Sequence, residues 1–153
     1  MKTETTTKQT SERELVTTRT INGPARLVFE AWTKPELFQR WWAPKSMGMV
    51  IVSCEMDVRV GGGYRLEIRH PSAPAPMSFF GKYLEVTPNA RLVWTNDESA
   101  TGPITTVTFE EIAGKTRVVL HDLFPSKEAL EESRGAEAGL PEQFDQLDEL
   151  LAT

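Results

Sequence analysis

The sequence predicts an α+β fold in which a curved antiparallel sheet is covered by a C-terminal helix. From Gly63 to Leu123 the apolar residues fall into short runs with period-two alternation, and Gly, Pro and Asn separate the runs. This pattern is typical of an antiparallel meander. Helical patterns occupy residues 24–42 and the stretch from Ser126 to the C-terminus. Because one helix cannot fill the concave face of a curved sheet, we expect a cavity between the two.

The first twelve residues, MKTETTTKQTSE, are polar and rich in Thr, and they lack apolar periodicity. We therefore expect residues 1–12 to form a disordered arm and residues 13–153 to form a single domain. Apolar and polar positions alternate over residues 13–21, which predicts the first strand. The turn residues Asn22-Gly23-Pro24 end that strand.

Two short helices follow the first strand. Pro24 suits a first helical turn, and apolar residues recur at helical spacing over residues 27–32, so this helix turns an apolar stripe to the core. Pro35 begins a second helix of about two turns, which ends before Ala43-Pro44.

The other strands are predicted from the same alternation, with turns rich in Gly, Pro or Asn between them. They cover residues 49–58, 63–70, 77–87, 90–97, 104–112 and 115–123, which with the first strand makes about seven. Ser126 suits the N-cap of a short helix. Pro141 restarts a helix through Leu151, and the apolar stripe of this helix would cover the cavity.

Composition and charge narrow the class of protein. A chain of 153 residues fits one domain that buries roughly 70% of its unfolded surface. The net charge is −5 and the basic residues are scattered, so we expect neither nucleic acid nor a membrane as a partner. The single cysteine, Cys54, excludes an intramolecular disulfide, and residues 1–20 lack the apolar core of a signal peptide. We therefore expect a cytoplasmic protein.

Alternation within the strands assigns side chains to the cavity. In residues 77–87 the assignment depends on Lys82 facing water. The side chains expected on the inner face are Tyr64, Leu66, Ile68, His70, Phe79, Tyr83, Glu85, Val118, Leu120 and Asp122. The result is an apolar pocket with a few polar groups, of which Glu85 and Asp122 are the acidic ones.

These polar groups permit several kinds of site. Glu85 and Asp122 could form an acid–base pair, although carboxylates at strand ends more often cap loops or pair with Arg.

Two His and one Cys without close spacing predict no metal site, and no cofactor is expected. Gly61-Gly62-Gly63 is interpreted as a turn, because no helix or Lys-Ser/Thr follows it. One of Trp41 and Trp42 should lie in the core.

The order of these segments resembles a known family. The resemblance runs from about residue 16 to residue 151, and the segments that carry it are INGPARLVFEAWTKPELFQRWWAP, VGGGYRLEIR, GKYLEVTPNARLVWT, TRVVLHDLFPSKEA and GLPEQFDQLDELLA. They resemble the bacterial proteins similar to the activator of Hsp90 ATPase homologue 1, within the START-like, Bet v 1-like (SRPBCC) superfamily. The resemblance implies a helix-grip fold of seven antiparallel strands, often with an apolar or amphipathic small molecule in its cavity. It implies no shared catalytic residues.

We therefore expect a binding protein for a small apolar or amphipathic ligand, existing as a monomer or homodimer, and we favour binding over catalysis. Two alternatives stay open: a module that contacts an Hsp90-type chaperone, and an enzyme of the cyclase or hydrolase kind that uses Glu85 and Asp122. The residues expected to line or close the ligand site are Phe29, Trp32, Trp41, Leu66, Ile68, His70, Tyr83, Glu85, Trp94, Leu120, Asp122, Phe144 and Leu147.

Overall fold

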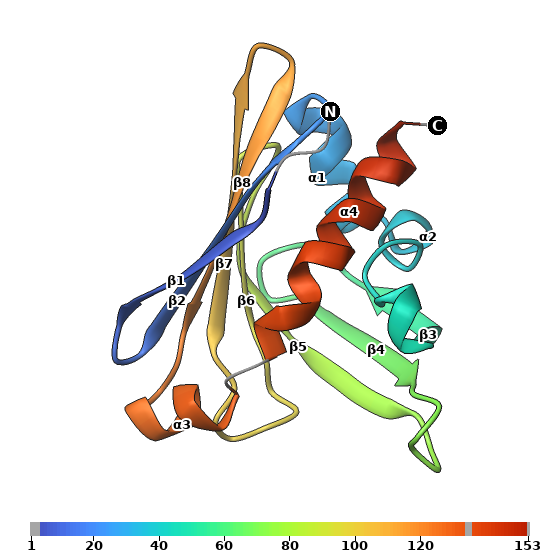
Figure 1. Ribbon diagram of the computed structural model, residues 1–153, viewed down its shortest axis with the longest axis vertical. Helices are drawn as coiled ribbons and strands as arrows, with labels where there is room; N and C mark the ends of the chain where they lie inside the picture. The colour runs from blue at the N-terminus through green and yellow to red at the C-terminus, as the bar shows by residue number, and fades with distance from the viewer. Residues whose placement is uncertain (1–3, 134–135, 153) are drawn as a thin grey trace.

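The computed structural model describes residues 4–133 and 136–152, and it contains one antiparallel sheet with helices on its concave side (Figure 1). The strands are β1 (Thr6–Ser11), β2 (Glu14–Ile21), β3 (Val50–Met56), β4 (Gly63–Arg69), β5 (Met77–Thr87), β6 (Arg91–Thr95), β7 (Ile104–Ile112) and β8 (Lys115–Leu123). The helices are α1 (Ala25–Thr33), α2 (Pro35–Phe38), η1 (Lys45–Met47), α3 (Lys127–Glu132), η2 (Ala136–Gly139) and α4 (Leu140–Leu151).

The sheet order is β1-β2-β8-β7-β6-β5-β4-β3, so the N-terminal hairpin joins the last strand of the meander. This confirms the predicted α+β helix-grip architecture, in which α4 crosses the inner side of the sheet (Figure 1). The predicted N-cap is also present, because Ser126 Oγ accepts a hydrogen bond from Ala129 N at 3.0 Å.

The expected disordered arm over residues 1–12 is wrong for Thr6–Ser11, which form β1 and raise the strand number to eight. Every residue of β1 is exposed, and the strand pairs only with β2. An edge strand that buries no side chain needs no apolar alternation, and Thr favours extended backbone. The first three residues lie outside the described part of the chain.

The core is an aromatic cluster between α1, α4 and the sheet. Trp32 lies at its centre, 1% exposed, with six aromatic rings at centroid distances of 4.8–6.4 Å. Trp41 is fully buried and its indole nitrogen donates to Ala31 O at 2.9 Å. Phe144 and Leu147 of α4 are also fully buried. These contacts hold α4 against α1 and the sheet.

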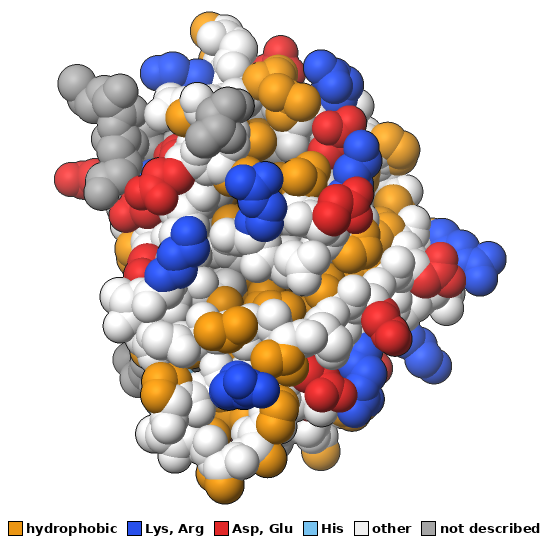
Figure 2. Space-filling view, turned by 90° about the vertical axis from the view of Figure 1, so that its right-hand side faces the viewer, with side chains coloured by type: hydrophobic (Ala, Val, Ile, Leu, Met, Phe, Trp, Pro, Cys, Tyr) orange, Lys and Arg blue, Asp and Glu red, His pale blue; other side chains and the backbone are white. Residues whose placement is uncertain are grey.

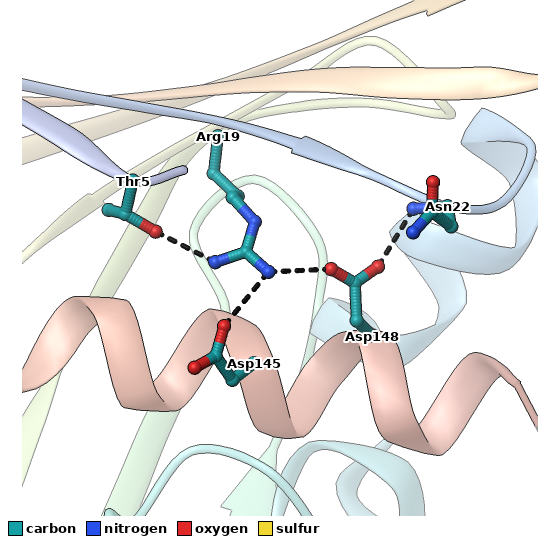
Figure 3. Close-up of polar contacts among 5 residues, drawn as sticks. All are labelled: Thr5, Arg19, Asn22, Asp145 and Asp148. Carbon is teal, nitrogen blue, oxygen red and sulfur yellow. Dashed lines mark hydrogen bonds and ion pairs between the residues drawn. The ribbon is translucent and has the colours of Figure 1, made fainter. Parts of the chain in front are cut away.

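A buried arginine links β2 to α4 (Figure 3). The Arg19 side chain is 1% exposed, and its Nη2 lies 2.7 Å from Asp148 Oδ2 and 2.9 Å from Asp145 Oδ1. Its Nη1 donates to Thr5 Oγ1 at 2.9 Å, and Asp148 Oδ1 accepts from Asn22 N at 2.8 Å. Asp145 lies on α4, and its carboxylate pairs with this guanidinium across the interface between helix and sheet.

No helix in the described part of the chain is long and apolar enough to cross a membrane.

Candidate functional site

A cavity of about 700 Å³ lies between the sheet and the chain segments that precede and begin α4. Indole, phenyl and aliphatic side chains make up most of its lining. Met47 of η1 belongs to the lining and is also 51% exposed, so the cavity reaches the surface beside η1. On the face that carries α2 and β3, hydrophobic side chains gather in a band between charged groups (Figure 2).

Seven of the predicted site residues line this cavity: Trp32, Leu66, Ile68, Tyr83, Trp94, Leu120 and Asp122. The alternation of β4 therefore places its side chains as expected for Leu66 and Ile68, and Tyr64 joins them on the wall. A role for these residues in binding a ligand stays a prediction.

Four predicted site residues lie in the packed core, away from the cavity wall. Phe29, Trp41, Phe144 and Leu147 are between 0% and 9% exposed, and their neighbours are other core side chains. The apolar stripe of α4 was expected to close the cavity. Its centre packs instead on the aromatic cluster, as the ring of Phe144 lies 6.4 Å from those of Trp32 and Trp41. The expectation that these four line the cavity is wrong.

Glu85 is outside the cavity because β5 carries a bulge. Tyr83 pairs with Trp94 and Glu85 with Val93, so Leu84 is an extra residue and the alternation changes phase after Tyr83. Leu84 is 48% exposed, and the Glu85 carboxylate pairs with the exposed Arg91 at 3.1 Å. Asp122 therefore lies on the cavity wall and Glu85 outside it. The prediction that these two residues form an acid–base pair is wrong.

His70 follows the end of β4, where the chain turns away from the cavity. Its Nδ1 accepts from Ser72 N at 3.1 Å and lies 2.6 Å from Ser72 Oγ. The imidazole is therefore engaged in the turn after β4, and it is absent from the cavity wall.

One row of residues across the sheet forms the back wall of the cavity. In register, Tyr83 pairs with Trp94, Trp94 with Thr105, Thr105 with Asp122 and Asp122 with Leu15. All five line the cavity. Because paired residues on neighbouring antiparallel strands point to the same face, the row follows from strand register alone.

A hydrogen-bonded chain of polar side chains runs along this wall. Tyr64 Oη donates to Thr95 O at 2.8 Å and lies 3.3 Å from Asn96 Oδ1. Asn96 Nδ2 donates to Thr105 Oγ1 at 2.9 Å, and Thr105 Oγ1 donates to Asp122 Oδ1 at 2.6 Å. We call Tyr64, Asn96, Thr105 and Asp122 the polar wall.

Burial changes the titration of several groups around the cavity. It raises the pKa of the hydroxyls of Tyr64 and Tyr83 well above the ordinary value, so both stay protonated. Partial withdrawal from water also raises the pKa of Glu98, which lines the cavity. At the rim, the hydroxyl and the backbone N–H of Ser46 donate to Glu142 and lower the pKa of its carboxylate.

Glutamine side chains of α4 hold the chain segment that borders the cavity mouth. Gln146 Nε2 donates to Trp41 O at 2.7 Å and to Ala43 O at 2.9 Å, and Gln146 Oε1 accepts from Lys45 N at 2.9 Å. Gln143 Nε2 donates to Trp42 O. These contacts position Trp42, which lines the cavity while Trp41 lies in the core, and η1, which was missed as a site element. Amide side chains give no apolar signal that would have indicated them.

Among the described residues, no group of three or more His, Cys, Asp and Glu is placed to hold a metal ion. Burial, with a smaller contribution from Glu36, raises the pKa of the Cys54 thiol to about 11, so this thiol is a poor nucleophile near neutral pH.

Comparison with known proteins identifies relatives over nearly the whole chain. The family profile described as "Activator of Hsp90 ATPase homolog 1-like protein" matches residues 22–152. A crystal structure of a protein from Nitrosomonas europaea is 26% identical, with a TM-score of 0.83 over 94% of this chain and 97% of that one. A solution structure from Staphylococcus epidermidis is 27% identical, with a TM-score of 0.79 over 94% and 92%.

A protein described as AHSA1-like, from Aeromonas hydrophila, shares the fold with a TM-score of 0.71 and 20% identity over 90% of this chain and 95% of that one. The comparison with curated proteins found no match.

Proposed function

The chain belongs to the activator of Hsp90 ATPase homolog 1-like family, and from this membership and its cavity we propose that it binds a small apolar or amphipathic molecule. The cavity is the observation that carries the proposal. Its volume of about 700 Å³ falls within the range of about 300–1,000 Å³ that small-molecule sites occupy.

The lining supports an apolar ligand body. Trp32, Leu66, Ile68, Trp94 and Leu120 come from α1, β4, β6 and β8 and meet around one space. Water next to such side chains is unfavourable, so an apolar molecule that displaces this water binds with a favourable free energy. This free energy is roughly proportional to the apolar area covered.

The polar wall supports an amphipathic ligand. Thr105 and Asp122 present oxygen atoms on a surface that is mostly apolar. A few polar groups in an apolar pocket fix the orientation of a ligand. We therefore place the polar end of the ligand at this wall and its apolar body against the indole and aliphatic side chains.

Native mass spectrometry of protein purified from its own host, beside a denatured sample, tests for a co-purifying molecule. A titration with the neutral probe N-phenyl-1-naphthylamine tests the site itself. Leu120→Trp places an indole in the cavity and should weaken probe binding at least about tenfold. Leu84→Trp makes the same change on the exposed side of β5 and should leave binding unchanged. Equal binding by wild type and Leu120→Trp would contradict a site in this cavity.

The family description supports a second candidate, a module that contacts an Hsp90-type chaperone. The ATPase rate of purified bacterial Hsp90, measured with a saturating excess of this protein, tests it. An unchanged rate removes this candidate. A rate change that persists in Leu120→Trp would assign the contact to the outer surface and not to the cavity.

A further inference from the structure

Two tyrosines line the cavity, and they differ in whether the hydroxyl hydrogen is already used. Tyr64 Oη lies 2.8 Å from the backbone oxygen of Thr95, which can only accept, so the hydrogen of Tyr64 is used there. Tyr83 is 3% exposed, and its ring centre lies 5.8 Å from that of Tyr64. No hydrogen bond joins the Tyr83 hydroxyl to another described residue. A molecule in the cavity can therefore accept the hydrogen of Tyr83 but not that of Tyr64.

The side chains beside Tyr83 also carry hydrogen-bond donors. Tyr83 of β5 pairs in register with Trp94 of β6, so the two side chains are neighbours on the cavity face of the sheet. The ring of Trp32 lies 5.8 Å from that of Trp94, and Trp32 Nε1 is buried without a hydrogen-bond partner among the described residues. The indole nitrogen of Trp94 likewise makes no hydrogen bond to a described residue. An indole nitrogen only donates, and we call Tyr83, Trp94 and Trp32 the donor cluster.

Displacement of water makes the Tyr83 hydrogen selective for the ligand. Water can accept this hydrogen until a ligand covers the hydroxyl. A hydrocarbon then leaves the buried hydrogen without an acceptor, which is costly, whereas an oxygen on the ligand replaces the acceptor. A ligand group that only donates would meet the oxygen of Tyr83 and leave its hydrogen unpaired. Burial raises the pKa of the Tyr83 hydroxyl, so the hydrogen is present at neutral pH.

We propose that Tyr83 is a ligand-binding residue that donates its hydroxyl hydrogen to an oxygen acceptor on the ligand, such as a ketone, ester or ether oxygen. The ligand is thus an amphipathic molecule that carries such an oxygen beside its apolar body. This inference rests on the proposed function and names the ligand class of the same cavity, with the residue that holds it. It places no limit on additional donor groups of the ligand.

Two probes of the same shape test the inference, 2-acetylnaphthalene and 2-isopropenylnaphthalene, in which a methylene group replaces the ketone oxygen. Displacement of N-phenyl-1-naphthylamine measures the affinity of each probe. Water solvates the ketone better than the alkene, so the informative quantity is the change in the ketone-to-alkene affinity ratio between wild type and variant. In Tyr83→Phe this ratio should fall at least about tenfold, because the ketone loses a hydrogen bond and the alkene no longer buries an unpaired hydrogen.

Tyr64→Phe is the matched control, because it removes the same hydroxyl from the same cavity. The hydrogen of Tyr64 is used by the backbone oxygen of Thr95, so this variant can change both affinities but should keep their ratio within about threefold of the wild-type value. The infrared carbonyl band of bound 2-acetylnaphthalene gives a second measurement, on the wild-type protein alone. A hydrogen bond from Tyr83 should move this band below its frequency in hexane.

Four results would each overturn this inference and leave the proposed function intact. They are a change in the ratio of less than about threefold in Tyr83→Phe, an equal fall in Tyr64→Phe, a carbonyl band at the hexane frequency, and displacement of N-phenyl-1-naphthylamine by the alkene but not by the ketone. Failure of N-phenyl-1-naphthylamine and of both probes to bind would overturn the proposed function together with the inference.

Discussion

The link between Arg19 and α4 leads to a quantitative prediction for Arg19→Met. This change removes ion pairs of 2.7 and 2.9 Å and leaves the carboxylates of Asp148 and Asp145, 12% and 30% exposed, without the guanidinium. Breaking a fully buried pair costs about 3–5 kcal/mol. Because both carboxylates keep some contact with water, we expect the lower end, about 3 kcal/mol. For a chain of this size, such a loss lowers Tm by roughly 6–12 °C.

Urea unfolding measures the free energy of unfolding of each variant. A single variant at an exposed ion pair and a double variant serve as controls. Arg91→Met breaks an exposed pair, 46% and 44% exposed at its two ends, and should cost no more than about 1 kcal/mol. In Arg19→Met/Asp148→Asn the uncompensated charge at 148 is gone while the oxygen that accepts from Asn22 N remains. This double variant should recover about 1–2 kcal/mol of the loss. A cost for Arg19→Met as small as that of Arg91→Met, or no recovery in the double variant, would refute the reasoning.

Three further predictions follow from single positions. In Gly81→Ala the added Cβ would clash with the backbone oxygen of Thr95, so the change should cost about 3 kcal/mol in urea unfolding. In Gly23→Ala the added Cβ meets only a leucine side chain at 3.3 Å, so the cost should be far smaller. Alkylation of Cys54 by iodoacetamide at about pH 8 should be about 100-fold slower than that of a free thiol, because its pKa is about 11 instead of 9.0; equal rates would contradict its burial. Burial raises the pKa of Glu98 in the folded protein, so the stabilisation of its protonated form is complete below pH 4.5 and is lost as the pH rises. The free energy of unfolding of Glu98→Gln should therefore match that of the wild type at low pH and exceed it at neutral pH. The reverse order of stability at neutral pH would refute the assignment.

Strand positions could be predicted from the sequence wherever one face of the strand is buried. The boundaries of β4, β5, β7 and β8 match the period-two pattern to within about one residue, because their inner faces are apolar. The pattern fails for β1, whose side chains are all exposed and whose stability comes from backbone pairing with β2. An edge strand of this kind carries no burial signal.

The cavity wall was predictable only in part, because one extra residue changes the phase of a strand. Alternation assigned Tyr83 correctly, and the bulge at Leu84 then turned Glu85 outward. Apolar character does not mark a bulge, since Leu84 itself is 48% exposed. Thr105 of β7, by contrast, pairs with Asp122 of β8. The register of these two strands would have placed Thr105 on the cavity wall, whereas its polar side chain gives no hydrophobic signal.

The sequence pattern also cannot distinguish a residue in the packed core from a residue that lines a cavity. The interior of this protein contains both kinds of region. Trp41 and Phe144 are fully buried among other aromatic rings and do not line the cavity, so truncation there should mainly cost stability. Around Leu120 and Asp122 the same interior is hollow, so a larger side chain can enter without displacing the core. Trp32 belongs to both regions, since it is the centre of the aromatic cluster and also lines the cavity. A change at Trp32 should therefore affect unfolding and binding together, whereas changes at Phe144 and at Leu120 should affect them one at a time.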